Sequence, residues 1–430
     1  MGMKAEIKER IEMINRGEVP EGYKKTKVGI IPQNWEEDRF GDLLKVASGE
    51  GLIQKEMEYG IYPVYGGNGI SGWHNLYNFK ESKIIIGRVG AYCGSVNLTK
   101  GKAWITDNAL YVKEKLRDFC DLFMYYKLIY INLNRFAEKN AQPLISGAKI
   151  YEIRTKIPPI MEQRKIAEIL SIWDKAIELK EKLIEQKKEQ KKGSMQTLLT
   201  GKVRVNEAGK INRKQLKLRI EMIKRGQIPE GYKKTKVGII PEEWEAKKAK
   251  EIFKNHTNKK HNAELEVLSA TQDRGVIPRS QLDIDIKYDI NSLTSYKKVE
   301  KGNFVISLRS FQGGIEYSEY EGLVSPAYTV LKNKISISDN YYRFLLKKED
   351  FINRLNSVIY GIRDGKQIGY SGFGELYLQY PPNREQQTIA EILSHSAKEI
   401  ELLEKELEAL KEQKKGLMQL LLTGKVRVKY

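Results

Sequence analysis

The chain has 430 residues, of which 40% are apolar and 30% charged, a composition typical of soluble proteins with two or three domains. No stretch is long and apolar enough to span a membrane, the start lacks a secretory signal, and two cysteines are too few for a disulfide framework, so a cytoplasmic location is expected. Lys and Arg number 75 against 56 acidic residues, and the net charge of +19 favours nucleic acid as a partner. A Lys/Glu-rich surface of the thermophile type accounts for part of this charge.

The chain opens with a block that occurs twice. Residues 10–36, RIEMINRGEVPEGYKKTKVGIIPQNWE, return as residues 219–245 with most positions identical. In each copy the pattern predicts a short amphipathic helix that ends at a Gly and a Pro. An extended GIIP segment and a Trp follow it.

Two inserts of low mutual identity, residues 37–157 and 246–380, follow the two blocks. Each contains an apolar strand that runs into an Arg and then a Gly, as KIIIGRVGAYCG in the first and NFVISLRSFQGG in the second. Each continues with a segment rich in β-branched and aromatic residues, ITDNALYVK or LVSPAYTVLK, which predicts a strand, and then with helical stretches. This shared order predicts one fold that carries two different surfaces.

Each insert leads into a long predicted helix that starts at a Pro-Pro pair. Residues 158–205 and 381–428 are identical at most positions, without a gap. In the second copy, residues four and three apart form an a/d seam that requires a partner helix: Ile389, Leu393, Ser396, Ile400, Leu403, Leu407, Leu410, Lys414, Leu417 and Leu421. The first copy has a weaker seam, namely Ile166, Leu170, Trp173, Ile177, Lys180 and Ile184. We therefore expect two helices of roughly 55 Å that pair with each other.

The connection after the first helix sets the direction of this pair. Residues 206–218 reach roughly 43–47 Å when fully extended, and a parallel pair would need the chain to return most of a helix length. An antiparallel pair needs almost no return and is the expected arrangement. Gly201 and Gly424 are expected to end the helices, and Gly193 and Gly416 to loosen them.

The sequence has no convincing catalytic or cofactor motif. GGNGISG at residues 66–72 contains a G-x-G-x-x-G, but no helical pattern follows, so a turn between strands is favoured over a dinucleotide site. A phosphate-binding G-x-x-x-x-G-K-[ST] loop is absent, and IPPI and YPPN differ from the tetrapeptide of amino-methyltransferases. Asp283, Asp285 and Lys287 alternate with Ile as in an ordinary strand, and His256 and His261 lack metal-ligand spacing. The chain is expected to bind rather than to catalyse, with no metal or cofactor of its own.

Two dissimilar inserts, each preceded by GIIPxxW and followed by PPxxEQxxIAEIL and LLTGKVRV, resemble the specificity subunit of type I restriction–modification enzymes. The resemblance covers nearly the whole chain. It implies an α+β fold with two similar globular α/β target recognition domains separated by a long antiparallel two-helix coiled coil. The recognition domains would be residues 1–157 and 219–380, the spacer helices residues 158–205 and 381–430, and the linker residues 206–218.

The resemblance also implies a function. Each recognition domain of the family reads one half of a bipartite double-stranded DNA target, and the coiled coil sets the spacing and docks two modification subunits. These partners would bind S-adenosylmethionine and methylate adenine, and restriction subunits would supply ATP- and Mg-dependent translocation and cleavage. A stand-alone bipartite DNA-binding regulator is the alternative, and a nuclease-fused enzyme that acts alone is a further one.

Base readout requires polar side chains at an edge that faces a groove, whereas phosphate contacts require only positive charge. In the Gly-rich turns of the first insert we select Asn68, Trp73, His74, Arg88, Tyr92, Gln142 and Lys149. In the second insert we select Arg274, Arg279, Arg309, Gln312, Arg363, Lys366, Gln367 and Tyr370. Arg88 and Arg309 are favoured as a pair because each follows an apolar strand, although a solvated or structural role is the alternative for every residue. Trp173, Ile172 and Leu198 on the first long helix are candidates for partner contacts or, equally, for the seam.

Overall fold

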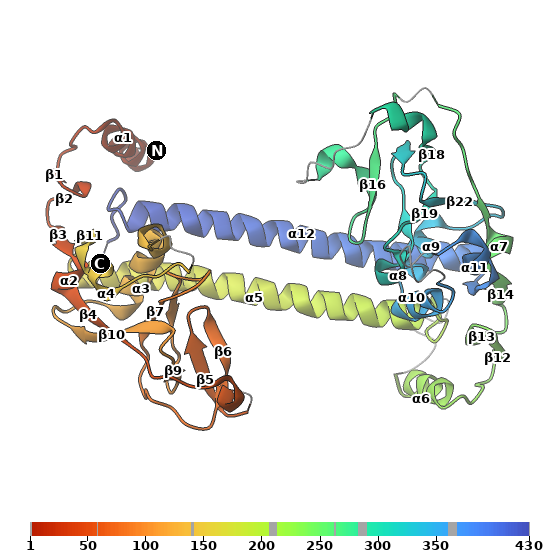
Figure 1. The fold of residues 1–430 in the computed structure, drawn as a ribbon, viewed down its shortest axis with the longest axis horizontal. Helices are drawn as coiled ribbons and strands as arrows, with labels where there is room; N and C mark the ends of the chain where they lie inside the picture. The colour runs from red at the N-terminus through yellow and green to blue at the C-terminus, as the bar shows by residue number, and fades with distance from the viewer. Residues whose placement is uncertain are drawn as a thin grey trace. The chain divides into compact units, whose positions relative to one another are not determined.

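The chain forms two compact units, each of which contains one globular domain and parts of two long helices (Figure 1). The computed structural model describes residues 2–57, 59–138, 142–205, 213–261, 264–282, 290–359 and 368–429. Unit 1 comprises residues 1–181 and 405–430, and unit 2 comprises residues 182–404. Unit 1 is thus built from two segments that are far apart in the sequence.

Domain 1, the globular part of unit 1, is built on an antiparallel four-stranded sheet of order β4-β10-β7-β8. Its strands are β4 (Leu44–Ser48), β7 (Ile84–Gly87), β8 (Val96–Leu98) and β10 (Ala109–Lys115). A three-stranded sheet contains β5 (Tyr62–Gly66), β6 (Gly69–His74) and β9 (Trp104–Ile105). The remaining elements are α1 (Gly2–Arg16), β1 (Tyr23–Thr26), β2 (Gly29–Pro32), β3 (Glu36–Arg39), α2 (Phe40–Leu43), η1 (Gln54–Met57), α3 (Asp121–Ile131), η2 (Leu133–Phe136), α4 (Gly147–Glu152) and β11 (Arg154–Ile157).

Domain 2, the globular part of unit 2, has the corresponding sheet in the order β15-β22-β19-β20. Its strands are β15 (Phe253–Asn255), β19 (Phe304–Ile306), β20 (Glu316–Tyr317) and β22 (Thr329–Asn333). Smaller sheets contain β12 (Tyr232–Thr235), β13 (Gly238–Pro241), β14 (Glu245–Lys248), β16 (Leu268–Thr271), β17 (Gly275–Pro278), β18 (Lys297–Val299), β21 (Gly322–Val324) and β23 (Tyr377–Tyr380). The helices are α6 (Arg213–Lys224), α7 (Ala249–Ile252), η4 (Arg279–Gln281), η5 (Ile290–Ser295), α8 (Ser310–Gly313), α9 (Asp339–Leu345), α10 (Glu349–Asn356) and α11 (Tyr370–Glu375).

The two domains share one order of elements, which confirms the prediction from the inserts. In domain 1 Ala109 on β10 pairs with Gly87 on β7, and in domain 2 Thr329 on β22 pairs with Ile306 on β19. These registers make Gly87 and Ile306 equivalent as the last residues of their strands. Arg88 therefore follows its strand by one residue, whereas Arg309 follows by three. The two arginines therefore lie in equivalent loops of the two domains but at different positions within those loops.

The two long helices are α5 (Ile160–Leu198) and α12 (Asn383–Leu421). All predicted seam residues are buried or half-buried, which confirms the a/d seam. Both helices pass through the glycines that were expected to loosen them, Gly193 and Gly416. Each ends as predicted, close to a Gly with positive φ, at Gly201 (φ 69°) and Gly424 (φ 75°).

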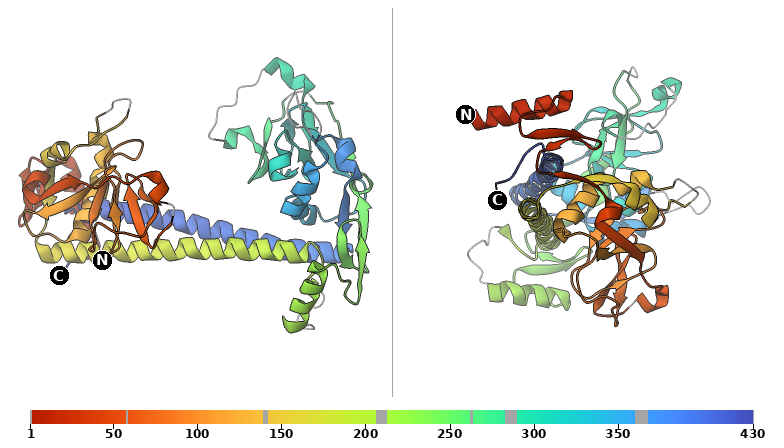
Figure 2. Two further views of the ribbon diagram at one scale, coloured as in Figure 1. Left: turned by 60° about the horizontal axis from the view of Figure 1, so that its bottom comes forward. Right: turned by 90° about the vertical axis from the view of Figure 1, so that its left-hand side faces the viewer.

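Ion pairs show that α5 and α12 run antiparallel in each unit, as the short connection predicts. In unit 1 Asp174 pairs with Lys414, and Lys180 pairs with Glu406 at 2.8 Å. In unit 2 Lys188 pairs with Glu404 at 2.7 Å, and near the end of α5 Arg204 pairs with Glu385 at 2.8 Å. The helices lie side by side in the views of Figures 1 and 2. The last residues of the predicted linker, 213–218, belong to α6 instead.

A buried carboxylate joins three segments at the start of each long helix. In unit 1 Glu162 is fully buried, accepts a hydrogen bond from Trp35 Nε1 at 3.0 Å, and binds the Arg427 guanidinium at 2.6 and 2.7 Å. In unit 2 Glu385 accepts from Trp244 Nε1 at 2.8 Å and from Arg204 at 2.8 and 3.1 Å. The Trp comes from the opening block and the Arg from the segment that follows the other helix.

The glutamine after each of these glutamates attaches the helix to its domain. Gln163 donates to the Pro158 carbonyl at 2.9 Å and accepts from the backbone N–H of Cys120, the N-cap of α3, at 3.0 Å. Gln386 likewise donates to the Pro381 carbonyl at 2.8 Å and accepts from the N–H of Ser338, the N-cap of α9, at 2.9 Å. Both glutamines are buried, so these bonds are shielded from water.

We expect Glu385→Ala to lower the free energy of unfolding by about 3 kcal/mol, because the change leaves a buried indole N–H without its acceptor and leaves the buried Arg204 guanidinium with Glu243 as its only carboxylate partner among the described residues. Arg204 and Glu385 each have only 8% of the side chain exposed. The matched control is Glu412→Ala on the same helix, where 73% of the side chain is exposed, and its effect should stay below about 1 kcal/mol. Urea unfolding of both variants measures the difference. Equal losses would contradict a special role for the buried carboxylate.

Candidate DNA interface

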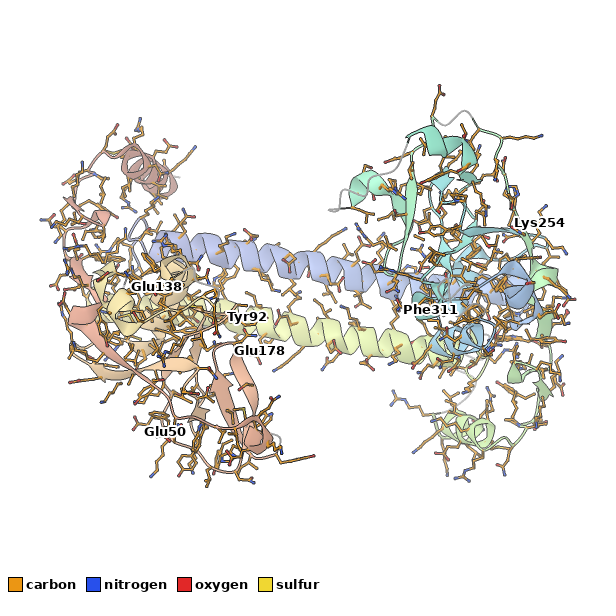
Figure 3. The ribbon with its side chains drawn as sticks, in the orientation of Figure 1. Glu50, Tyr92, Glu138, Glu178, Lys254 and Phe311 are labelled. Atoms are coloured by element: carbon orange, nitrogen blue, oxygen red, sulfur yellow. The ribbon has the colours of Figure 1, made fainter. Side chains whose placement is uncertain are left out.

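A hollow of about 730 Å³ lies in domain 1 between the β5–β6 turn and the loop after β7. Asn68 and Tyr92, two of the predicted DNA-binding residues, line it, and both are exposed (Tyr92 is labelled in Figure 3). Asn108 and the 2% exposed Thr106 line it as well, and the Thr106 hydroxyl has no hydrogen-bond partner among the described residues. The hollow thus presents amide, hydroxyl and phenol groups of the kinds that contact base edges and phosphates.

Glycine allows the two loops around this hollow to approach each other closely. A Cβ built on Gly87 would lie 2.4 Å from the Gly67 carbonyl oxygen and 2.5 Å from the Tyr92 carbonyl oxygen. Arg88 follows directly, and its guanidinium donates to the Ser48 hydroxyl at 3.3 Å. The turn Gly66–Gly69 joins two strands and leads into no helix, so the structure confirms the turn that was predicted there.

The other predicted residues of domain 1 lie outside this hollow. Trp73 and His74 are at the far end of β6, where Trp73 has 47% of its surface exposed. The His74 ring is engaged within the fold, since Nδ1 lies 2.8 Å from the Glu56 carbonyl oxygen and the ring packs edge-on against Trp104 at 5.4 Å. Gln142 and Lys149 are exposed on the segment around α4. The hollow therefore brings together Asn68 and Tyr92, and Arg88 lies in the adjoining loop without lining it, whereas these four residues lie elsewhere.

In domain 2 the basic residues gather around Tyr328. Burial raises the pKa of the Tyr328 hydroxyl, and the positive charges of Arg279 and Arg309 act in the opposite direction. The Lys297 amine donates to the Tyr328 carbonyl, and Arg279 Nε donates to the Ser269 hydroxyl at 3.2 Å. This set of Arg279, Lys297, Arg309 and Tyr328, the Tyr328 cluster, combines positive charge with an aromatic ring and suits DNA.

Sequence reasoning missed Asn108 and Tyr328, although the internal repeat contains the signal. The registers described above align Ala109 with Thr329. Asn108 directly precedes Ala109, and Tyr328 directly precedes Thr329. Both therefore stand at the entrance to the central strand of their sheets, next to predicted residues. An alignment of the two inserts on the strands β10 and β22, followed by comparison of the residues next to them, would have found both.

Two further predicted residues of domain 2, Gln312 and Arg274, are found at or beside the β16–β17 turn. Gln272 in that turn donates from Nε2 to Gln312 Oε1 on α8 at 3.1 Å. Arg274 in the same turn is exposed, and its guanidinium donates to the Gln281 carbonyl at 3.4 Å. Tyr370 differs, because its hydroxyl donates to the Phe253 carbonyl at 2.9 Å and so serves the domain core. Arg363, Lys366 and Gln367 lie outside the described residues, as do Asp283, Asp285 and Lys287.

Potential metal sites and membrane spans are not found in the part of the chain that the structure describes. No group of His, Cys, Asp and Glu there could hold a metal ion, and His261 Nε2 instead lies 3.0 Å from the Tyr296 carbonyl oxygen. The helices of the same residues are not apolar enough over a sufficient length to cross a bilayer.

The three residues suggested for partner contacts have different environments. Leu198 has 6% of its surface exposed and packs in the core of domain 2. The prediction that it is a surface contact for a partner is therefore wrong. The chain segment after α5 folds back over it, as the bond from the Val203 N–H to the Thr197 carbonyl shows. Trp173 is half-buried, as its place in the seam requires. Ile172 remains 61% exposed on α5.

Comparison with known proteins agrees with this architecture. Residues 32–188 and 241–412 match the family described as type I restriction modification DNA specificity domain. The chain is 27% identical over 447 aligned positions to the specificity subunit of the type I restriction enzyme MjaVIII of Methanocaldococcus jannaschii, across 95% of this chain and 97% of that one. It is 34% identical over 140 residues to the EcoprrI specificity subunit of Escherichia coli, across 31% of this chain and 35% of that one.

A solved structure shares the fold. The S subunit of a type I restriction–modification system from M. genitalium superposes with a TM-score of 0.57 at 18% identity, across 90% of this chain and 96% of that chain. The family match covers more than half of the residues and includes both repeats. The chain therefore belongs to the type I restriction modification DNA specificity family, and its role is DNA recognition within such a system.

We expect Arg88→Ala and Arg309→Ala to act on different parts of the DNA target. Each should weaken or alter the reading of one half by about 1–3 kcal/mol and leave the other half unchanged, because each arginine lies in its own domain. Arg164→Ala, at an exposed position on α5, is the control. Methylation mapping in cells that carry each variant gives the result. Equal weakening of both halves by Arg88→Ala would show a phosphate contact or a role in folding instead.

Proposed function

We propose that domain 1 and domain 2 each read one half of a bipartite double-stranded DNA sequence, and that the antiparallel helices fix the spacing between the halves. The observation that supports this most directly is the repeated sheet with different surfaces. The order β4-β10-β7-β8 recurs as β15-β22-β19-β20, yet the same loop positions carry an amide-lined hollow in one domain and the Tyr328 cluster in the other. One scaffold with two chemistries suits two different half-sites.

The remaining chemistry is proposed to belong to partners. Two modification subunits would bind S-adenosylmethionine and methylate adenine, and restriction subunits would use ATP and Mg. The described residues of this chain contribute recognition and docking, without a cofactor of their own. The complex is proposed to act in the cytoplasm, where its DNA is accessible.

The candidate docking surface for a modification subunit is an exposed apolar stripe on α5. Met161, Ile172 and Leu179 have 52%, 61% and 57% of their surface exposed, and their spacing places them on one face of the helix. Leu402, at the repeat position of Leu179 on α12, is 50% exposed. An apolar residue that stays exposed at the same place in both copies of the repeat fits one partner on each copy.

Replacement of these residues tests the docking. Co-expression with a modification subunit should give a complex of one chain with two such subunits, and Leu179→Asp and Leu402→Asp should each lose one of them. Mass measurement of the purified complexes gives the stoichiometry, with the exposed Lys175→Gln as control. A lone stable monomer that still binds DNA specifically would favour the stand-alone regulator.

A longer helix tests the spacing role. Insertion of four residues near Glu189 in α5 adds roughly 6 Å, which corresponds to one or two base-pair steps. Methylation mapping should show an altered spacer between unchanged half-sites. An unchanged spacer with intact methylation would contradict the proposal that the helices set the distance.

A further inference from the structure

A seam position of the two long helices has a different environment in each unit. In unit 1 the Lys414 amine pairs with the Asp174 carboxylate and lies 5.2 Å from the centre of the Tyr126 ring. The Tyr126 hydroxyl donates to the same carboxylate at 2.6 Å. Burial and the Asp174 charge raise the pKa of Tyr126, so the hydroxyl stays a donor. These three side chains fill the space between α3, α5 and α12.

The equivalent residues of unit 2 lack both oxygen groups. Lys191 occupies the repeat position of Lys414 and lies 5.6 Å from the centre of the Phe344 ring. Phe344 of α9 is the equivalent of Tyr126 of α3, because each residue follows the N-cap of its helix, Ser338 or Cys120, by the same number of residues. These N-caps are the residues that Gln386 and Gln163 bind. Ala397 stands at the repeat position of Asp174. The carboxylate and the phenol are therefore both missing beside a retained lysine.

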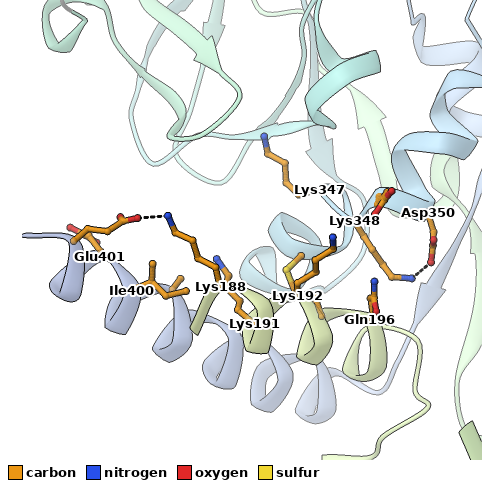
Figure 4. A pocket seen from close by; sticks show the side chains of 13 residues that line it. Lys188, Lys191, Lys192, Gln196, Lys347, Lys348, Asp350, Ile400 and Glu401 are labelled. Carbon is orange, nitrogen blue, oxygen red and sulfur yellow. Dashed lines mark hydrogen bonds and ion pairs between the residues drawn. The ribbon is translucent and has the colours of Figure 1, made fainter. Parts of the chain in front are cut away.

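A hollow of about 520 Å³ opens beside this lysine (Figure 4). Lys188, Lys191 and Lys192 of α5 form one wall, and Ala397, Ile400, Glu401 and Glu404 of α12 form another. Domain 2 closes the hollow with residues 347–350, which are two lysines followed by Glu349 and Asp350. The difference between the units extends to a methionine. Met418 is 7% exposed in unit 1, whereas its repeat equivalent Met195 is only partly buried and lines the hollow.

The lysines of this hollow differ in their partners. Lys188 pairs with Glu404 at 2.7 Å, Lys348 pairs with Asp350, and Lys347 pairs with Glu316 and donates to the Gln272 carbonyl at 2.9 Å. Lys191 and Lys192 have no hydrogen-bond or ion-pair partner among the described residues. Burial, aided by the charge of Arg343, lowers the pKa of the Lys191 amine, since Glu404 offsets it only in part. A partly buried ammonium group whose charge Glu404 offsets only in part is stabilised by an added anion.

We propose that this hollow binds a small oxyanion from solution, a phosphate or a carboxylate ion, which takes the place that the Asp174 carboxylate has in unit 1. The anion accepts hydrogen bonds from Lys191 and Lys192 and joins α5 to the α9–α10 segment of domain 2. The hollow of about 520 Å³ has room for such an ion together with water. Binding would make the attachment of domain 2 to its helices depend on a ligand, whereas domain 1 carries its own counter-charge.

The experiment measures phosphate binding to the whole chain by calorimetry and by thermal unfolding at constant ionic strength. Phosphate should bind saturably at one site and raise the melting temperature. The double variant Ala397→Asp/Phe344→Tyr copies unit 1 into unit 2. It should melt at a higher temperature without phosphate and bind phosphate about tenfold or more weakly. Any increase in the melting temperature of this variant on addition of phosphate measures the general salt effect.

The reciprocal variant is the matched control. Asp174→Ala/Tyr126→Phe copies unit 2 into unit 1 and should raise the number of phosphate ions bound from one to two. Acetate and a nucleoside triphosphate tested beside inorganic phosphate distinguish a general oxyanion site from one that needs a larger ligand. Absence of saturable binding, or equal phosphate binding by the natural chain and the Ala397→Asp/Phe344→Tyr variant, would overturn the proposal.

Discussion

The fold depends on one carboxylate buried at the start of each long helix. Burial removes water from the carboxylates of Glu162 and Glu385. A guanidinium, an indole N–H and the positive end of the helix replace the lost hydrogen bonds and compensate the charge. The three groups come from segments that only an antiparallel helix pair can bring together within each unit. The same contact therefore fixes the helix direction, seats the opening block and holds the segment after the other helix.

The repeat separates what is constant from what varies. Sheet order, the bonds of Gln163 and Gln386, and the helix ends at Gly201 and Gly424 recur in both units. Loop chemistry differs, from Asn68 and Asn108 in domain 1 to the Tyr328 cluster in domain 2. Packed positions also differ, among them the neighbourhood of Lys414 and Lys191. Recognition can thus change at the loops without disturbing the scaffold.

Local patterns predicted the scaffold better than the site. The a/d seam, the antiparallel direction and the glycine helix ends follow from spacing and chain length, which the sequence displays directly. The role of Glu162 does not, because Trp35 and Arg427 are distant in sequence. Arg88 and Arg309 stand at different distances from the ends of their strands, and only the strand registers reveal this. Leu198 is covered by a segment that the sequence presents as a simple helix end. Long-range packing of this kind leaves no periodic signal.

The division of the chain has a consequence for synthesis on the ribosome. Unit 2 is one continuous stretch, residues 182–404, whereas unit 1 needs residues 405–430 as well as 1–181. Domain 1 is translated first but waits roughly ten to forty seconds, at ordinary elongation rates, for its second helix and for Arg427. Until then the apolar face of α5 around Ile166 and Leu170 lacks the cover that Met418, Leu421 and Leu422 supply in the complete unit. The nascent chain therefore exposes an apolar surface that a chaperone could bind. A stop codon soon after residue 404 would leave unit 1 incomplete, although its domain is made first, and would leave unit 2 complete.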